Sequence, residues 1–267
     1  MTHPSSECPL MLTFAPNISW LFPEFPFRVR PAVAAGAGFE AIEFGFPSHA
    51  DLDALDAAHK DLGLKIVLFN QDVPVWDRAN RGYLVDPARR DEFRHRLDES
   101  LEIAKRLDVI KIMLPAGVVV DGMSREAQLT CMIENLHYAA PLAAQVGVLL
   151  TIEVLNPVDN PGYFLTSSGE ALQVVKEVNH PNLRFQFDTY HLQMMEGNLS
   201  QTFRDNAGWI GHIQFADYPG RHEPRTGSIN FDEFSAAIEN LYNGYIGLEY
   251  VPLAKGEAAL HWLTSGT

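Results

Sequence analysis

Four residues with metal-binding oxygen atoms recur along the second half of the chain, each in or next to a short apolar run. They are Glu153, Asp188, Gln214 and Glu249, in the runs LLTIEVL, LRFQFD, HIQFAD and YIGLEYV. An ionised carboxylate inside such a run needs a partner, a metal ion or a catalytic task. Three carboxylates and one amide oxygen form a hard ligand set, which suits Mg²⁺ or Mn²⁺ better than zinc. The four residues therefore predict one divalent metal ion, Mg²⁺ or Mn²⁺, as the cofactor.

Two of these ligands also have a structural interpretation. Glu153 could pair with an Arg or Lys at the end of a strand, and Gln214 could be a buried amide that satisfies backbone groups. The spacing favours the metal site, because the intervals of 35, 26 and 35 residues each match about one strand and helix. Neighbouring parallel strands would then direct all four side chains toward one place.

The chain alternates between strand-like and helix-like segments with short turns, which indicates βα units around a parallel sheet. The strand-like runs are 11–18, 41–46, 65–70, 109–114, 149–155, 183–188, 212–217 and 245–251. The helix-like segments are 26–36, 51–62, 87–107, 124–146, 168–178, 199–208, 231–242 and 257–263. Eight units in 267 residues favour an α/β fold, a single (β/α)8 TIM barrel. We expect a loose N-terminal tail at 1–10 and one catalytic barrel domain at 11–267.

A histidine and a charged segment follow two of the predicted ligands. His191 lies three residues after Asp188, where it either hydrogen-bonds a substrate oxygen or is an ordinary loop histidine. The segment 218–231, YPGRHEPRTGSINF, is long for a connection and is expected to cover the site. The planar guanidinium group of Arg221 or Arg225 could bind a carboxylate, or the segment could be a solvated charged loop.

A lysine adds to the charge balance of this site. A divalent cation among three carboxylates leaves a negative remainder, so a substrate carboxylate needs fixed cations, for which Arg221 and Lys111 are candidates. Lys111 lies in the apolar run VIKIML, where its ammonium group cannot stay unpaired. It reaches the site or pairs with an acid of the barrel wall such as Glu43, and we expect the second.

Composition and charge argue against several kinds of partner. The net charge of −14 repels phosphate backbones, so we expect no nucleic acid. The first residues lack the features of a signal peptide and no run approaches the ~20 apolar residues of a membrane span, so we expect no membrane partner. Two cysteines without metal-binding spacing indicate a reduced, cytoplasmic setting. The motif GAGFEA at 36–41 precedes a strand instead of following one, so we expect no nucleotide cofactor.

Several longer motifs resemble a known family. They are FAPNISWLF, GFEAIEFGFP, EVLNPVDNPGYFL, DTYHLQMMEGNL, GHIQFADYPGRHEPRTGSINF and GLEYVP. From about residue 11 onward the chain resembles the xylose isomerase-like (sugar isomerase/epimerase) TIM-barrel superfamily and, within it, the hydroxypyruvate isomerase family. The resemblance implies that Glu153, Asp188, Gln214 and Glu249 are the metal ligands. In related keto-sugar epimerases a histidine takes a place similar to Gln214.

The resemblance also implies a reaction. It indicates a metal-dependent isomerase of carbohydrate metabolism that interconverts hydroxypyruvate and tartronate semialdehyde through an enediolate, whose charge a Lewis-acid metal stabilises. Two glutamates on opposite sides can act as acid and base, which makes Glu153 and Glu249 the expected catalytic residues. By resemblance to the epimerases, Asp159, His191 and Arg221 hold the substrate, and we expect Arg221 to receive its carboxylate.

Three other functions remain open. An isomerase of 2-oxo-tetronate or of a small ketose would keep every metal ligand and change only pocket contacts. An apurinic endonuclease-like phosphodiesterase of the same superfamily would use a multi-zinc histidine set and a basic surface, whereas the ten histidines here are dispersed. A non-catalytic binding barrel would leave four aligned ligands without a purpose. The expected partner is a small hydroxy-keto acid substrate, and assembly into a homo-oligomer is left open.

Overall fold

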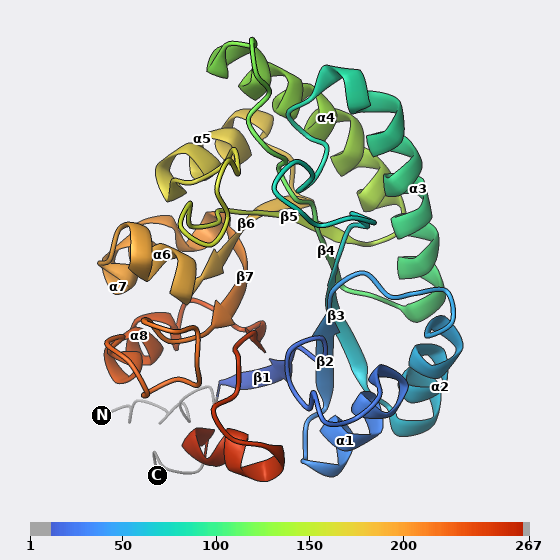
Figure 1. The fold of residues 1–267 in the computed structure, drawn as a ribbon, viewed down its shortest axis with the longest axis vertical. Coiled ribbons are helices and arrows are strands. Elements are labelled where there is room, and N and C mark those ends of the chain that lie inside the picture. The colour runs from blue at the N-terminus through green and yellow to red at the C-terminus, as the bar shows by residue number, and fades with distance from the viewer. Residues whose placement is uncertain (1–11, 264–267) are drawn as a thin grey trace, which may run out of the picture.

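The strands form one parallel, nearly closed barrel (Figure 1). The computed structural model describes residues 12–263, so the predicted tail at 1–10 lies outside the described residues. The sheet has eight strands in the order β1-β8-β7-β6-β5-β4-β3-β2. Strands β1 and β2 meet through an isolated parallel bridge between Asn17 and Glu43. The strands are β1 (Thr13–Pro16), β2 (Ala41–Phe44), β3 (Lys65–Asn70), β4 (Lys111–Met113), β5 (Leu149–Glu153), β6 (Leu183–Asp188), β7 (Ile210–Phe215) and β8 (Tyr245–Leu248). The predicted (β/α)8 TIM barrel is confirmed.

Helices surround the barrel on its outside (Figure 1). The α-helices are α1 (Arg30–Gly36), α2 (Leu52–Leu62), α3 (Arg90–Leu107), α4 (Arg125–Gln145), α5 (Ser168–Val178), α6 (Thr189–Met195), α7 (Leu199–Asn206) and α8 (Phe231–Ile238). Short 3₁₀ helices are η1 (Phe27–Val29), η2 (Pro87–Arg89), η3 (Ala207–Trp209) and η4 (Gly256–Leu263). Within residues 12–263, no helix combines the length and apolar character needed to cross a membrane.

One helix was not predicted from the sequence. Helix α6 begins directly after the last residue of β6, with no intervening turn. The carboxylate of Asp188 makes this change possible, because its Oδ1 accepts hydrogen bonds from the backbone N–H groups of Tyr190 (2.7 Å) and His191 (3.2 Å). Such a side-chain cap satisfies the first free N–H groups of a helix. His191 therefore lies on the first turn of a helix and not on a loop.

The two faces of the strands differ in character. In β5, Leu150 and Ile152 belong to the large apolar core between the strands and the helices. Residues in between point to the opposite face, where Thr151 Oγ1 donates to Gln186 Oε1 (2.8 Å). The strand is buried on both faces, as its composition indicates. Its inner face, however, carries polar side chains that need hydrogen-bond partners inside the barrel.

Part of the barrel interior is a chain of polar groups. Lys111 Nζ lies 3.1 Å from His212 Nδ1, and His212 Nε2 lies 2.7 Å from Glu43 Oε2. Glu43 is the acid whose charge favours the ammonium form of Lys111, as expected, but the imidazole of His212 stands between the two groups. Burial lowers the pKa of Lys111 to about 8 and raises the pKa of Glu43 to about 7. Burial also lowers the pKa of His212 well below its ordinary value, so a neutral ring connects the two.

Gly247 makes room for the Glu43 carboxylate. A Cβ atom added at Gly247 would lie 2.5 Å from Glu43 Oε1 and 2.6 Å from its Cδ. We predict that Gly247→Ala lowers the free energy of unfolding by about 1–3 kcal/mol, the usual cost of overpacking. Urea unfolding measures this loss. Gly208→Ala is the control, because a Cβ atom there meets nothing within 4 Å, and equal losses in the two variants would contradict the packing argument.

Candidate active site and metal centre

The predicted ligands lie at the carboxyl ends of four consecutive strands. Glu153 and Asp188 are the last residues of β5 and β6, Gln214 is the penultimate residue of β7, and Glu249 directly follows β8. All four are buried. The strand register places Asp188 beside Gln214. Spacing along the sequence thus identified residues that the barrel brings to one end, where the active sites of this architecture lie.

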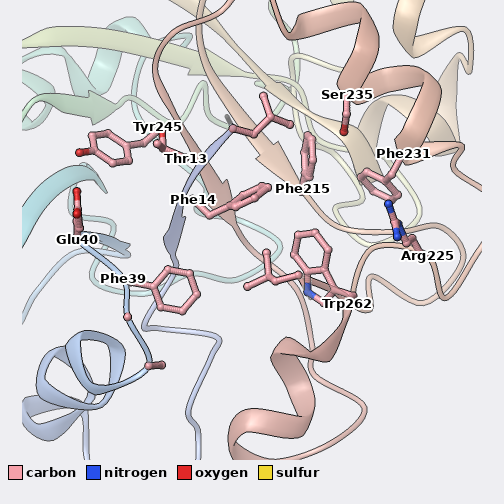
Figure 2. A pocket seen from close by; sticks show the side chains of 14 residues that line it. Thr13, Phe14, Phe39, Glu40, Phe215, Arg225, Phe231, Ser235, Tyr245 and Trp262 are labelled. Atoms are coloured by element: carbon pink, nitrogen blue, oxygen red, sulfur yellow. The ribbon is translucent and has the colours of Figure 1, made fainter. Parts of the chain in front are cut away.

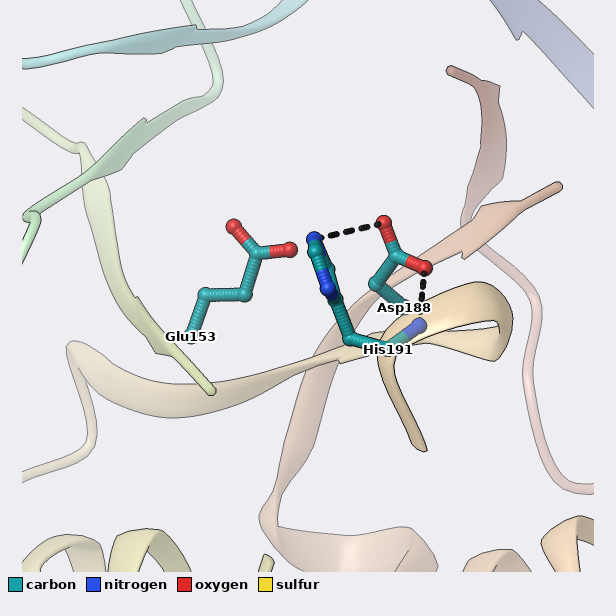
Figure 3. A group of neighbouring side chains, drawn as sticks. All are labelled: Glu153, Asp188 and His191. Atoms are coloured by element: carbon teal, nitrogen blue, oxygen red, sulfur yellow. Dashed lines mark hydrogen bonds and ion pairs between the residues drawn. The ribbon is translucent and has the colours of Figure 1, made fainter. Parts of the chain in front are cut away.

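Two of these carboxylates and a histidine form a close group (Figure 3). Glu153, Asp188 and His191 each offer one potential ligand atom, and these atoms all lie within 4.8 Å of one another. In Figure 3, the Glu153 carboxylate faces the His191 ring from one side, and Asp188 lies on the other side of that ring. His191 Nε2 lies 4.0 Å from Asp188 Oδ2. The two carboxylates of this group are the centre of the candidate metal site.

Gln214 joins this group through a second glutamine. The Gln186 amide nitrogen lies 3.2 Å from Glu153 Oε2 and 2.8 Å from Gln214 Oε1. Gln214 Nε2 donates to Glu43 Oε1 (2.7 Å). Because Glu43 as a carboxylate accepts hydrogen bonds, this contact fixes which end of the Gln214 amide is the oxygen. That oxygen keeps a second lone pair, which is what a ligand to a metal ion requires.

Arg221 and Asn17 connect Glu249 to the remaining acids. Arg221 Nη2 lies 2.6 Å from Glu249 Oε2 and 3.2 Å from Asp188 Oδ2. Asn17 Nδ2 lies 3.2 Å from both Glu249 Oε1 and Glu43 Oε1. Arg221 is thus engaged by two of the predicted metal ligands. Its guanidinium already offsets part of the negative charge that the sequence places here.

The electrostatics of the site fit an additional cation. Burial is the main cause that raises the pKa of Glu153 well above its usual range, and repulsion from Asp188 and Glu249 adds to it. Burial likewise raises the pKa of Glu249 to about 8. Glu153 Oε1 is buried without a hydrogen-bond partner among the described residues. An orphaned carboxylate oxygen beside further carboxylates is the donor arrangement that a hard divalent ion satisfies.

The hydrogen bonds of His191 argue against its being a metal ligand. Its Nδ1 accepts the backbone N–H of Asn156 (3.1 Å), so the single proton of the neutral ring lies on Nε2. Burial, aided by Arg221, lowers the pKa of His191 well below its ordinary value, which keeps the ring neutral. The Nε2–H group can therefore donate to a substrate oxygen but cannot bind a metal ion. This deduction leaves the fourth ligand position to a residue such as Gln214.

A cavity of about 420 Å³ lies over these residues. Its lining includes Glu153 and Glu249 together with the three predicted substrate-binding residues, Asp159, His191 and Arg221. Asp159 Oδ2 accepts hydrogen bonds from Tyr190 Oη (2.7 Å) and from Asn156 Nδ2 (2.9 Å). The volume lies within the roughly 300–1,000 Å³ that is common for small-molecule sites.

Arg225 does not take part in this site. It pairs with Asp232 Oδ1 (2.5 Å) on the surface and lines a different cavity of about 680 Å³. Figure 2 shows that cavity between Phe14 of β1, Phe231 of α8 and Trp262 of η4, outside the wall of strands. Aromatic rings form a large part of its lining. Of the two arginines that the loop 218–231 offered, only Arg221 reaches the acids.

The polar groups beneath the ligands were not predicted from the sequence. Gln186 and His212 are each two residues before a predicted ligand, and Asn17 follows β1. A signal for the first two was present, because residues i and i+2 of a strand share a face. Any polar residue two positions before a ligand therefore belongs inside the barrel with it.

Comparisons with known proteins identify the family of the chain. A family model described as "Xylose isomerase-like TIM barrel" matches residues 31–265. The chain is 39% identical over 254 residues to hydroxypyruvate isomerase of Escherichia coli (strain K12), which covers 95% of this chain and 98% of that protein. It is 38% identical over 253 residues to 2-oxo-tetronate isomerase of Pectobacterium atrosepticum, covering 94% and 97% of the two chains.

A solved structure is similar over the same length. The crystal structure of a protein named "AP endonuclease, family 2" from Brucella melitensis superposes with a TM-score of 0.91 at 37% identity, covering 96% of this chain and 99% of that one. The resemblance to hydroxypyruvate isomerases and the expectation of an isomerase are confirmed by the curated relatives. The chain belongs to the xylose isomerase-like TIM barrel family and, within it, to the group that contains hydroxypyruvate isomerases and 2-oxo-tetronate isomerases.

Proposed function

We propose that this protein is a divalent metal-dependent isomerase that interconverts hydroxypyruvate and tartronate semialdehyde. The observation that carries the proposal is the pair Glu153 and Glu249, which reach one cavity from β5 and from the end of β8 with raised pKa values. Glu153, Asp188, Gln214 and Glu249 would hold the ion. The name of the Escherichia coli relative supports the choice of substrate.

The side chains have different roles in the proposed reaction. Glu153 and Glu249 act as the base and the acid that move a proton between C3 and C2, while a second proton passes between the oxygens on these two carbons. His191 donates its Nε2–H to a substrate oxygen, while Asp159 and Arg221 complete the walls around the substrate. A divalent ion held by the four predicted ligands would supply Lewis-acid stabilisation of the negative charge that develops on the substrate. Burial of the site excludes water and strengthens each of these electrostatic contacts.

A closely related alternative is an isomerase of 2-oxo-tetronate, the substrate in the name of the Pectobacterium relative. It would use the same ligands and the same proton transfer. The name of the Brucella protein raises a phosphodiesterase as a further alternative. The net charge of −14 opposes that function, because DNA binding depends on a basic surface. We therefore also propose a small hydroxy-keto acid as the partner, without nucleic acid or membrane, in a cytoplasmic setting.

Glu249 is predicted to transfer a proton as well as bind the ion. Glu249→Gln keeps an oxygen that can bind metal but removes the proton acceptor, so metal content should largely survive while kcat falls about 10²-fold or more. Metal analysis and steady-state kinetics on the same sample measure both quantities. Glu102→Gln on the exposed surface of α3 is the control. Retained activity with retained metal would assign the proton transfer to another group.

Metal binding is also predicted to stabilise the fold through Glu153. Adding Mn²⁺ to chelator-treated protein should restore activity and raise the melting temperature, because a ligand at about 100 times its Kd adds roughly 2.7 kcal/mol to stability. Glu153→Gln should show a smaller rise, since the orphaned charge that attracts the ion is gone. Differential scanning calorimetry with and without Mn²⁺ tests this. The same rise in both proteins would mean that the ion binds elsewhere.

A further inference from the structure

A second arginine lies behind the wall of the active-site cavity. Arg81, on the loop between β3 and η2, is 6% exposed. Within residues 12–263, no carboxylate lies within 4.0 Å of its guanidinium nitrogens, whereas Arg221 touches both Asp188 and Glu249. A buried arginine without a carboxylate in direct contact is costly, because its charge has lost water and only the more distant charge of Asp77 acts in its favour. Arg81 is therefore a candidate to attract an anionic ligand.

Arg81 contacts the cavity through two residues that line it. Its Nη1 donates a hydrogen bond to Asn160 Oδ1, and its guanidinium carbon lies 5.7 Å from the centre of the Trp76 ring. Its Nε donates to the backbone oxygen of Asp77 (3.0 Å). Asn160 and Trp76 both belong to the lining of the cavity that holds Glu153 and Glu249. The positive charge therefore lies directly behind the cavity wall.

Asn160 has one polar group left for a ligand. It is 9% exposed, its backbone N–H and oxygen bond within the loop to Asn156 and Tyr163, and Arg81 occupies its Oδ1. Because arginine can only donate, it fixes the orientation of the Asn160 amide, with Nδ2 on the other side. No described residue accepts a hydrogen bond from that Nδ2. This donor in the cavity wall, which no described protein group occupies, is available to an acceptor on the substrate.

We propose that Asn160 recognises the carboxylate of the substrate. Arg81 orients the Asn160 amide and places a positive charge behind it. This proposal deepens the proposed function and rests on it, since it makes the substrate an oxo acid and not a neutral ketose. Asn160 would touch the carboxylate, and Arg81 is a positioning residue that acts through it. Arg221 is less suited to that task because Glu249 and Asp188 already hold its Nη2. A positive charge behind the cavity wall favours an anion over a hydroxyl of the same size.

Two substrates of equal length test this selectivity. Dihydroxyacetone differs from hydroxypyruvate only in carrying a hydroxymethyl group in place of the carboxylate, so both undergo the same proton transfer. Arg81→Gln should reduce kcat/KM for hydroxypyruvate about tenfold to a hundredfold, mainly through KM, because losing the charge behind Asn160 and the contact that orients its amide weakens the hydrogen bond from Asn160 to the carboxylate. The value for dihydroxyacetone should change less than about threefold. Arg81→Lys should retain part of the preference for the acid.

A second variant keeps the test independent of folding. Asn160→Asp preserves the shape and the contact with Arg81, but it replaces the donor Nδ2 with an oxygen that repels a carboxylate. Turnover of hydroxypyruvate should fall by about a hundredfold or more, while turnover of dihydroxyacetone survives. Arg78→Gln, at an exposed arginine on the same loop, is the matched control and should change neither. Equal losses for both substrates in Arg81→Gln and Asn160→Asp would overturn the proposal.

Calorimetric binding of glycerate separates this proposal from the proposed reaction. Glycerate has the carboxylate and the hydroxyl groups but no carbonyl, so it binds without turnover. Weaker binding of glycerate to Arg81→Gln than to the unmodified, Mn²⁺-loaded protein would support the carboxylate site even if hydroxypyruvate is not isomerised. In that case the proposed reaction alone would fail. Equal binding to both proteins, or no binding to the unmodified one, would overturn the carboxylate site.

Discussion

The structure depends on placing four carboxylates inside one barrel with too few cations beside them. Glu43, Glu153, Asp188 and Glu249 are all buried, and their pKa values are all raised by burial. Arg221 contacts two of them, and the charge of Lys111 reaches only Glu43, through a neutral histidine. A negative excess of this kind is unfavourable for an isolated chain. It becomes an advantage once a divalent cation binds, because the ion then removes the repulsion among the acids.

Hydrogen bonds then determine the direction in which each ligand points. Glu43 orients the Gln214 amide, Gln186 joins Gln214 to Glu153, and Asn17 joins Glu43 to Glu249. The backbone of the loop after β5 has the same role for His191, because it determines which ring nitrogen carries the proton. Groups that bind a metal need this kind of support, since their orientation controls both affinity and reactivity. The barrel interior is therefore a layer that supports the site and not only a packed core.

The alternation of strand-like and helix-like segments made the fold predictable, and the regular spacing of three acids and one amide made the candidate ligands predictable. Consecutive βα units bring every such residue to the same end of a barrel. A spacing of one βα unit along the sequence therefore predicts that the residues are neighbours in the structure. Helix α6 was not predicted, because no turn residue separates it from β6 and Asp188 both ends the strand and caps the helix. The expected link between Lys111 and Glu43 exists, but His212, which stands between them, was not predicted. Arg81 could not be found from sequence, because its burial depends on the path of an irregular loop.

The central claim is that one divalent ion is held by oxygens of Glu153, Asp188, Gln214 and Glu249, with His191 reserved for the substrate. A crystal grown with Mn²⁺ and measured for anomalous scattering tests this most directly, because the signal locates the ion without assuming its ligands. We predict a single strong peak with metal–oxygen distances of roughly 2.0–2.6 Å to these four side chains. Arg221 should then have moved away from Asp188 or Glu249. A peak bonded to His191 Nε2, or a peak outside this cavity, would contradict the claim.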